Sequence, residues 1–299
     1  ERAVVLRSLA QLSEQSFDAI DDAVGFLKDV LMIEPRDEAA IADLERLYTK
    51  SEQFTDLVEL LEGEADAARE SGDTDKELTL LVRVGEIAGD ALDDKDRATS
   101  IYERVLERDP EHTRALAALA KLYEANGEWD RVAEVLRKAA SAGRGGPDEA
   151  EVHFRLARLA ESHLEDADGA LAELKLAVAA HPGHIEANRA LAAQYRKRKD
   201  NAGLCEALLR EEAHLDDKAK KLALLTEIAQ LQVTALGDPA AAVATLERAR
   251  ALEPASTPIL LALSDAYVAA GRGDEAIPVV EALIAAETMV GASGATVYA

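Results

Sequence analysis

The sequence predicts an all-α protein, a solenoid built of antiparallel helix pairs. Three observations predict it: an internal repeat of about 72 residues, apolar residues at helical spacing inside each copy, and a composition dominated by good helix formers. Charged residues make up 31% of the chain and aromatic residues only 4%. Strand-like runs of alternating polarity are absent, which argues against a sheet.

The repeat is defined by three kinds of marker residue that keep one register. Four prolines recur at nearly constant spacing. The step from each proline to a following tyrosine is identical in all four copies, and so is the step from a preceding alanine to the proline. The agreement of three markers indicates four copies of one unit. The markers are Pro35, Pro110, Pro182 and Pro254; Tyr48, Tyr123, Tyr195 and Tyr267; and Ala23, Ala98, Ala170 and Ala242.

Each copy is predicted to hold four helices, which gives sixteen in the chain. In the second copy, one apolar face at helical spacing consists of Ala98, Ile101, Tyr102 and Val105. The proline that follows ends this helix, because proline cannot continue the hydrogen-bond ladder. None of these helices is long enough to be stable alone, so stacking against neighbours must bury their apolar faces.

The expected helix ends also follow the register. Asp94, Asp166 and Asp238 each lie four residues before a marker alanine and are predicted N-caps. Gly127 and Gly271 each lie four residues after a marker tyrosine, where a positive φ angle would end a helix.

The pattern resembles the tetratricopeptide repeat. The first helix of that family's unit carries a large apolar residue, a leucine, a small residue and a tyrosine, as do Leu116, Leu119, Ala120 and Tyr123. The second helix carries small residues around an aromatic or leucine and ends before a proline, as do Ala170, Leu174, Ala177 and Pro182. Phe54 and Trp129 match an aromatic residue that opens the family's second helix.

The resemblance implies eight units arranged as four tandem double repeats in a right-handed superhelix. It covers residues 1–288, with double repeats at about 1–74, 75–146, 147–218 and 219–288. Every second unit has a few extra residues, which we expect in its first helix or the preceding loop. Residues 289–299 break the pattern and are expected to form a non-repeat tail.

Charge and cysteine usage restrict the partners and the compartment. The net charge of −24 repels nucleic acids and anionic lipids, and no apolar run is long enough to span a bilayer, so we expect neither nucleic-acid binding nor membrane insertion. Cys205 is the single cysteine and is expected to be a buried structural thiol, which fits a reducing, cytoplasmic location. A periplasmic location stays open, because the sequence begins inside a helical pattern without an initiator methionine and its natural start is expected to be missing.

No motif predicts catalysis, a cofactor or a metal, so we expect a protein that is not an enzyme. His181 and His184 are the only tight histidine pair, and they lie in a predicted loop where a metal would need two further ligands. The basic run Arg196–Lys199 is either a nuclear or nucleic-acid signal or, as we favour, the end of a helix whose dipole attracts cations.

The family resemblance also implies where a partner would bind. In that family the first helix of each unit lines the inner, concave wall, along which partner peptides or helices lie. Carrying the groove positions over gives Arg46, Lys121, Arg189 and Arg196 as candidates to face acidic groups of a protein partner; the alternative is ordinary exposed helix charge. The family's grip on a chaperone's C-terminal carboxylate is not expected, because its asparagine is replaced by Asp43, Ala118, Ala190 or Ala262.

Two functions follow from this reasoning. The first is a protein–protein interaction scaffold or adaptor that binds a partner peptide or helix along the concave face. The alternative is a regulatory or substrate-docking arm of a larger enzyme whose catalytic domain lies outside these residues. The partner's identity and the oligomeric state are left open.

Overall fold

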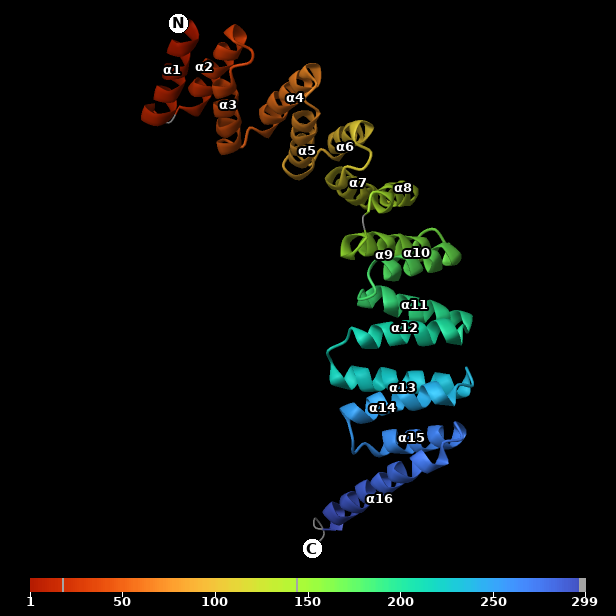
Figure 1. Cartoon of the computed structure of the whole chain (residues 1–299). Coiled ribbons are helices and arrows are strands. Elements are labelled where there is room, and N and C mark those ends of the chain that lie inside the picture. Colours follow the sequence, from red (N-terminus) through yellow and green to blue (C-terminus); the bar gives the residue numbers. More distant parts are fainter. Residues whose placement is uncertain (18, 144, 296–299) are drawn as a thin grey trace. The chain divides into compact units, whose positions relative to one another are not determined.

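The computed structural model describes residues 1–17, 19–143 and 145–295, with side chains described as far as residue 285. These residues form sixteen α-helices and no strand (Figure 1), which confirms the predicted all-α class. The chain divides into two compact units, Glu1–Ala142 and Gly143–Ala299. Inside each unit, every helix packs mainly against the helices that precede and follow it in sequence, as a solenoid requires. The right-handed sense of the superhelix and the double-repeat boundaries stay predictions.

The helices form eight pairs, and in each pair the odd-numbered helix comes first. The first unit contains α1 (Arg2–Phe17), α2 (Ile20–Ile33), α3 (Glu38–Lys50), α4 (Phe54–Ser71), α5 (Thr74–Asp90), α6 (Lys95–Arg108), α7 (Thr113–Asn126) and α8 (Trp129–Ser141). The second unit contains α9 (Pro147–Ser162), α10 (Ala167–Ala180), α11 (Ile185–Arg198), α12 (Asn201–Ala213), α13 (Lys218–Thr234), α14 (Pro239–Leu252), α15 (Thr257–Ala269) and α16 (Gly273–Ala295). The predicted tail, residues 289–299, begins inside α16, and its residues 296–299 lie outside the described residues.

The predicted helix ends are confirmed. Asp94, Asp166 and Asp238 each accept a hydrogen bond from the backbone N–H three residues further on, at 3.0, 2.8 and 2.9 Å. Gly127 and Gly271 have φ angles of 73° and 71°. Helices α4 and α8 begin at the expected aromatic residues. The extra residues of every second unit lie in the first helices α5, α9 and α13, which have 17, 16 and 17 residues against 13 or 14 in α3, α7, α11 and α15.

The marker residues form the core of each copy. The four marker alanines are fully buried, because a small residue there lets the second helix approach its neighbours closely. Tyr48, Tyr123 and Tyr267 are also buried, but Tyr195 is only partly buried. The shared register therefore does not give the four marker tyrosines the same burial. Its ring lies against the backbone of α12 at Gly203, which brings no side chain to cover the ring.

Charged side chains contact the marker tyrosines in two alternating ways. In the second copy, the Tyr123 hydroxyl donates to Glu103 at 2.7 Å, and Arg131 lies over the ring at 4.2 Å. The fourth copy repeats this with Tyr267, Glu247 and Arg272. The first and third copies instead place a lysine near the ring, Lys28 and Lys175.

The first two copies, both in the compact unit Glu1–Ala142, each have an ion pair at the same two positions, but with the charges exchanged. Lys28 and Glu103 both lie five residues after a marker alanine, and Asp56 and Arg131 both lie eight residues after a marker tyrosine. Lys28 pairs with Asp56 at 3.0 Å, whereas Glu103 pairs with Arg131 at 2.5 Å. The same two positions therefore hold a cation and an anion in the first copy and an anion and a cation in the second.

Helices α5 and α6 approach closely where Gly85 faces the ring of Tyr102. A Cβ atom at Gly85 would lie 2.7 Å from that ring, and Tyr102 is itself buried and cannot move aside freely. We expect Gly85→Ala to lower the free energy of unfolding by about 1 to 3 kcal/mol, as overpacking of a core does. Chemical denaturation of residues 1–299 measures this loss.

The same substitution at Gly63 provides the control. Gly63 lies inside α4 with nothing within 4 Å of the position that a methyl group would take, so alanine there meets only solvent. Gly63→Ala should raise the free energy of unfolding by about 0.5 to 1 kcal/mol, because alanine is the better helix former. Equal effects of the two substitutions would contradict the close approach of α5 and α6.

Candidate protein-binding surface

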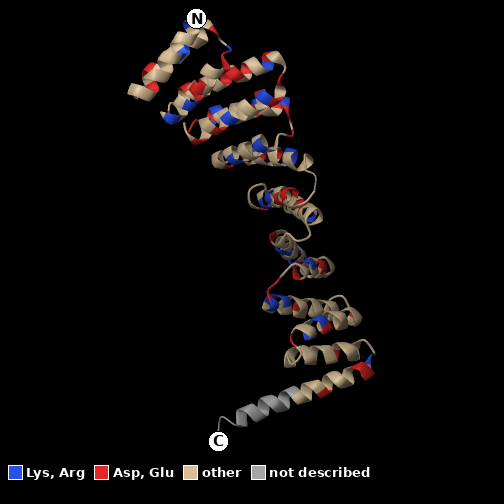
Figure 2. Ribbon diagram, turned by 60° about the vertical axis from the view of Figure 1, so that its left-hand side comes forward, with Lys and Arg blue, Asp and Glu red and all other residues tan. Residues whose placement is uncertain are grey.

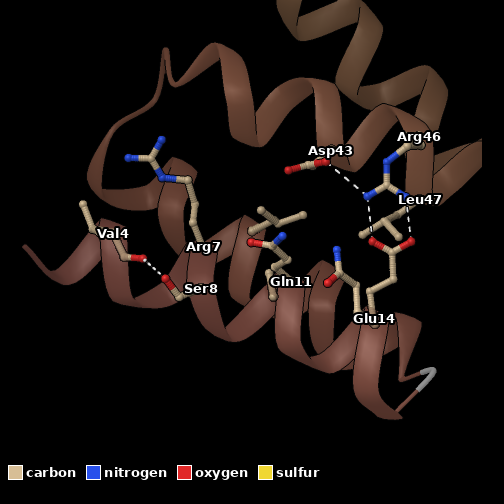
Figure 3. A pocket seen from close by; sticks show the side chains of 11 residues that line it. Val4, Arg7, Ser8, Gln11, Glu14, Asp43, Arg46 and Leu47 are labelled. Carbon is tan, nitrogen blue, oxygen red and sulfur yellow. Dashed lines mark hydrogen bonds and ion pairs between the residues drawn. The ribbon is translucent and has the colours of Figure 1, made fainter.

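The first helices of successive pairs line open grooves in the first unit. One groove, of about 350 Å³, lies between α1 and α3 (Figure 3). Arg7, Gln11 and Glu14 of α1 face Asp43 and Arg46 of α3 across it. Leucines of α2 and α3 contribute apolar surface. The groove is thus a polar cleft with its charges on the two first helices.

Arg46, the first candidate residue, is held inside this α1–α3 groove. Its guanidinium donates to both carboxylate oxygens of Glu14, at 2.6 and 2.7 Å, and to Asp43 at 3.1 Å. This bidentate contact holds the pKa of Glu14 below its ordinary value. An acidic group of a partner would therefore have to compete with two carboxylates of the chain.

A second groove, of about 360 Å³, lies between α5 and α7. Gly89 of α5 and the alanines Ala117 and Ala118 of α7 leave it open, because none of them carries a long side chain. Tyr102 of α6 also lines it, and burial, reinforced by the carboxylates of Glu86 and Asp90, raises the pKa of Tyr102 to about 12. The tyrosine is thus a neutral hydroxyl at any physiological pH.

Lys121 lines this α5–α7 groove and is exposed. The other cation of the groove, Arg114, pairs with Glu86 at 3.4 Å. Lys121 has no ion pair or hydrogen bond from its ammonium group to any residue that the structure describes. It is therefore a cation that a carboxylate from outside can meet without displacing one of the chain's own.

The other two candidates lie on α11 in the second unit, and both are paired. The guanidinium of Arg189 donates to Glu211 of α12 at 2.6 Å, and that of Arg196 donates to Glu227 of α13 at 2.6 Å. All four candidates thus lie on first helices, as the family resemblance implies, but three of them already contact carboxylates of the chain. Whether they form one partner-binding wall stays a prediction.

In the fourth copy, two apolar side chains stand at the positions that two arginines of α11 hold in the third copy. Leu261 and Val268 of α15 are both exposed, and they occupy the positions that Arg189 and Arg196 occupy relative to the marker tyrosines. These two residues were not among the candidates from the sequence, although the tyrosine register already placed them. The surface of the first helices therefore changes from charged to apolar between the third and fourth copies.

Two buried acids lie on α12, next to the third copy's candidates. Glu211 and Glu212 are both buried, and each pairs with one arginine: Glu211 with Arg189 of α11, and Glu212 with Arg248 of α14. Because a buried carboxylate without a cation is costly, these pairs tie α12 to the helices around it.

The remaining reactive residues have structural surroundings. His184 caps α11, its Nδ1 accepting from the backbone N–H of Ala187 at 3.2 Å, which confirms that the histidine pair lies in a loop. Cys205 is buried as expected, and burial raises the pKa of its thiol. The basic run does end a helix, α11, and its side chains pair with carboxylates: Arg196 with Glu227, Lys197 with Glu161, and Arg198 with Asp168.

The residues that the structure describes contain no group of three or more histidine, cysteine, aspartate or glutamate side chains placed to hold a metal ion. None of their helices combines the length and the hydropathy that crossing a bilayer requires.

Comparison with known proteins gives one family. The sequence model of the tetratricopeptide repeat matches residues 91–159 and 233–290. No curated protein sequence matches the chain.

Solved structures give likenesses at low identity. A tetratricopeptide repeat protein from Parabacteroides merdae is 15% identical, covering 89% of this chain and 98% of its own, with a TM-score of 0.37. The protein MamA is 20% identical over 68% of this chain and 94% of its own, with a TM-score of 0.31. YrrB, described as a tetratricopeptide repeat protein with an unusual peptide-binding site, is 14% identical. The match covers 76% of this chain and 94% of YrrB, with a TM-score of 0.35.

These TM-scores are too low to carry an argument about how the helices are arranged or what they bind. Residues 91–159 and 233–290 match the family model. The described residues form sixteen helices, which are consistent with eight units of the tetratricopeptide kind. The chain thus contains tetratricopeptide repeats, and proteins with such repeats are in general protein-interaction scaffolds.

Proposed function

We propose that this chain is a scaffold that holds an extended or helical segment of another protein against its first helices. The observation that carries the proposal is the α5–α7 groove, which is open and presents Lys121 without a carboxylate partner among the described residues. The Lys121 ammonium receives an acidic side chain or chain terminus of the partner.

The shape of the groove supports a peptide as its occupant. Gly89 of α5 and the alanines Ala117 and Ala118 of α7 carry no long side chain, so the backbone of a partner segment can approach closely. The Tyr102 hydroxyl and the Glu86–Arg114 pair supply polar groups along the same groove. A line of such contacts along successive helices fits a linear ligand better than a small molecule.

Arg46, Arg189 and Arg196 have a secondary part in this proposal. Each is held by a carboxylate of the chain. The binding free energy from a partner's acid is therefore only the difference between the new ion pair and the internal pair that it replaces. Their pairs with Glu14, Glu211 and Glu227 orient the guanidinium groups. A carboxylate of the partner contacts a guanidinium by displacing the chain's own carboxylate. Lys121 is therefore the residue whose charge should matter most to binding.

The test is a reversal of the charge of Lys121. A pull-down with residues 1–299, followed by mass spectrometry, supplies the partner, and titration calorimetry at low salt measures its affinity. We expect Lys121→Glu to weaken binding at least about tenfold, equivalent to about 1.4 kcal/mol, because an attraction becomes a repulsion. The stability of the protein should hardly change, because no ion pair of Lys121 with a described residue is lost.

Lys138→Glu is the matched control. Lys138 is an exposed lysine on α8, a second helix, where it pairs with Glu134 one turn away. It changes the net charge by the same amount, so equal weakening by both variants would indicate a general field effect. An unchanged affinity of Lys121→Glu at low salt would place the partner on another face.

A further inference from the structure

Charged side chains of both signs are interspersed along the helices of the first unit (Figure 2), and many of them pair with one another. Asp90 and Lys121 are two exceptions, and both line the α5–α7 groove. Asp90 is the exposed last residue of α5, and its carboxylate has no ion pair or hydrogen bond with any residue that the structure describes. The groove therefore presents one unpaired charge of each sign.

A third polar group of the groove also lacks a partner. Tyr102 is only 4% exposed, and its hydroxyl makes no hydrogen bond within the described part of the chain. The carbon that carries the hydroxyl lies 2.7 Å from the position that a Cβ atom would take at Gly85, so this end of the ring reaches α5. Burying a hydroxyl without a partner costs free energy, so an acceptor that reaches it from the groove stabilises the bound state.

This hydroxyl favours an extended occupant over a helical one. The hydroxyl is neutral at physiological pH and can donate to a carbonyl oxygen. A helix uses its backbone carbonyls in its own hydrogen bonds, whereas an extended segment leaves them free. Gly89, Ala117 and Ala118 let such a backbone come close, because none of them carries a long side chain.

The two unpaired charges determine which side chains the segment needs. Asp90 lies on α5 and Lys121 on α7, so they face the groove from its two walls. Successive side chains of an extended segment point to opposite sides. A basic side chain for Asp90 and an acidic one for Lys121 therefore stand an odd number of positions apart. A purely acidic segment would be attracted by Lys121 and repelled by Asp90.

We propose that the α5–α7 groove selects an extended segment with a basic and an acidic residue at an odd separation. The base pairs with Asp90, the acid pairs with Lys121, and a backbone carbonyl accepts from the Tyr102 hydroxyl. The inference rests on the proposed function and narrows it to one charge pattern and one conformation of the partner. The basic residue also offsets the long-range repulsion between an acidic segment and a chain of net charge −24.

The probe for the test is a phage-displayed library of random linear dodecapeptides, selected at low salt on immobilised protein of residues 1–299. We expect the enriched peptides to hold a lysine or arginine and an aspartate or glutamate at an odd separation. Selection on Asp90→Ala should lose the base and keep the acid, and selection on Lys121→Ala should do the reverse. A selected peptide should bind each variant about two- to fivefold more weakly, the range for an exposed ion pair.

Asp29→Ala is the matched control for these selections. Asp29 is an exposed acid on α2 that does not line the groove, so its loss changes the net charge as much as the loss of Asp90 does. Both enrichments should persist in this variant. Equal loss of the base in Asp29→Ala and Asp90→Ala would attribute the base to the general field of the protein and overturn the inference.

Tyr102→Phe tests the hydroxyl, because phenylalanine keeps the ring and removes only the oxygen. Thermal unfolding should hardly change, since no hydrogen bond with a described residue is lost. The affinity of a selected peptide, measured by fluorescence anisotropy, should fall about two- to tenfold. An unchanged affinity would overturn the backbone contact and with it the extended conformation.

The selections separate this inference from the proposed function. If the acid depends on Lys121 while the base survives in Asp90→Ala, or if the two charges stand an even number of positions apart, this inference is overturned and the proposed function stands. If no peptide is enriched, or if the enriched acid does not depend on Lys121, the proposed function is overturned and this inference with it.

Discussion

Replacing Tyr123 with alanine will lower the free energy of unfolding by about 3 to 5 kcal/mol, the range for removal of a large aromatic side chain from a core. The Tyr123 ring is buried between α6, α7 and α8, its hydroxyl donates to Glu103 at 2.7 Å, and Arg131 covers its face. Burial and Glu103 together raise the pKa of this tyrosine, so the hydroxyl stays a donor. Chemical denaturation followed by far-UV circular dichroism measures the loss.

The equivalent tyrosine of the third copy is the control for this prediction. Tyr195 is only partly buried, and its hydroxyl makes no hydrogen bond with any residue that the structure describes. Tyr195→Ala should therefore cost clearly less than Tyr123→Ala. Because repeats are coupled only to their neighbours, Tyr123→Ala should also broaden the transition. Equal losses for the two tyrosines would contradict the burial difference described above.

Replacing Arg248 with alanine will lower the free energy of unfolding by about 3 kcal/mol, the lower end for breaking a buried ion pair. Arg248 is the cation that pairs with Glu212, and Glu212 is buried on α12. Without the guanidinium, that carboxylate loses its charge partner at a buried position. The lower end is expected because Arg248 itself is half exposed, so water can reach the vacated position. Chemical denaturation at pH 7 measures the loss.

Arg210→Ala is the matched control for the buried pair. Arg210 pairs with Glu206 one turn earlier on the same helix, α12, and both side chains remain in contact with solvent. Its removal should cost only about 0.3 to 0.5 kcal/mol, as for other exposed pairs at this spacing. If Arg248→Ala cost no more than Arg210→Ala, the burial of Glu212 would not govern the stability of this junction.

The helices were predictable from the sequence because their determinants are local. Proline, a capping aspartate and a glycine with positive φ act within one turn of the chain, so a constant register such as that of Asp94, Pro110 and Gly127 locates each end. The marker alanines were predictable as core residues for a related reason. Where neighbouring helices pack closely, only a small side chain fits, and that requirement recurs in every copy.

The candidate site was less predictable, because its properties depend on residues far apart in sequence. The register placed Arg46 on a first helix. Its ion pair with Glu14, however, forms between residues that are 32 positions apart in sequence. Arg196 and Glu227 are 31 positions apart. Lys121 differs from them only because no carboxylate in the described part of the chain comes within reach. The partial exposure of Tyr195 likewise depends on a glycine in the next helix, which no property of Tyr195 itself reveals.

The reversed ion pairs of the first two copies bear on how a repetitive chain finds its own partners. Helices that share one register create the risk that one docks into the position of another during folding. If α2 took the place of α6, Lys28 would face Arg131, and if α6 took the place of α2, Glu103 would face Asp56. Both exchanges set like charges together at a site where the correct helix makes an ion pair. The sign reversal thus helps to distinguish two helices of the same register, and grafting α2 into the second copy should be less destabilising when Arg131 is changed to an acid as well.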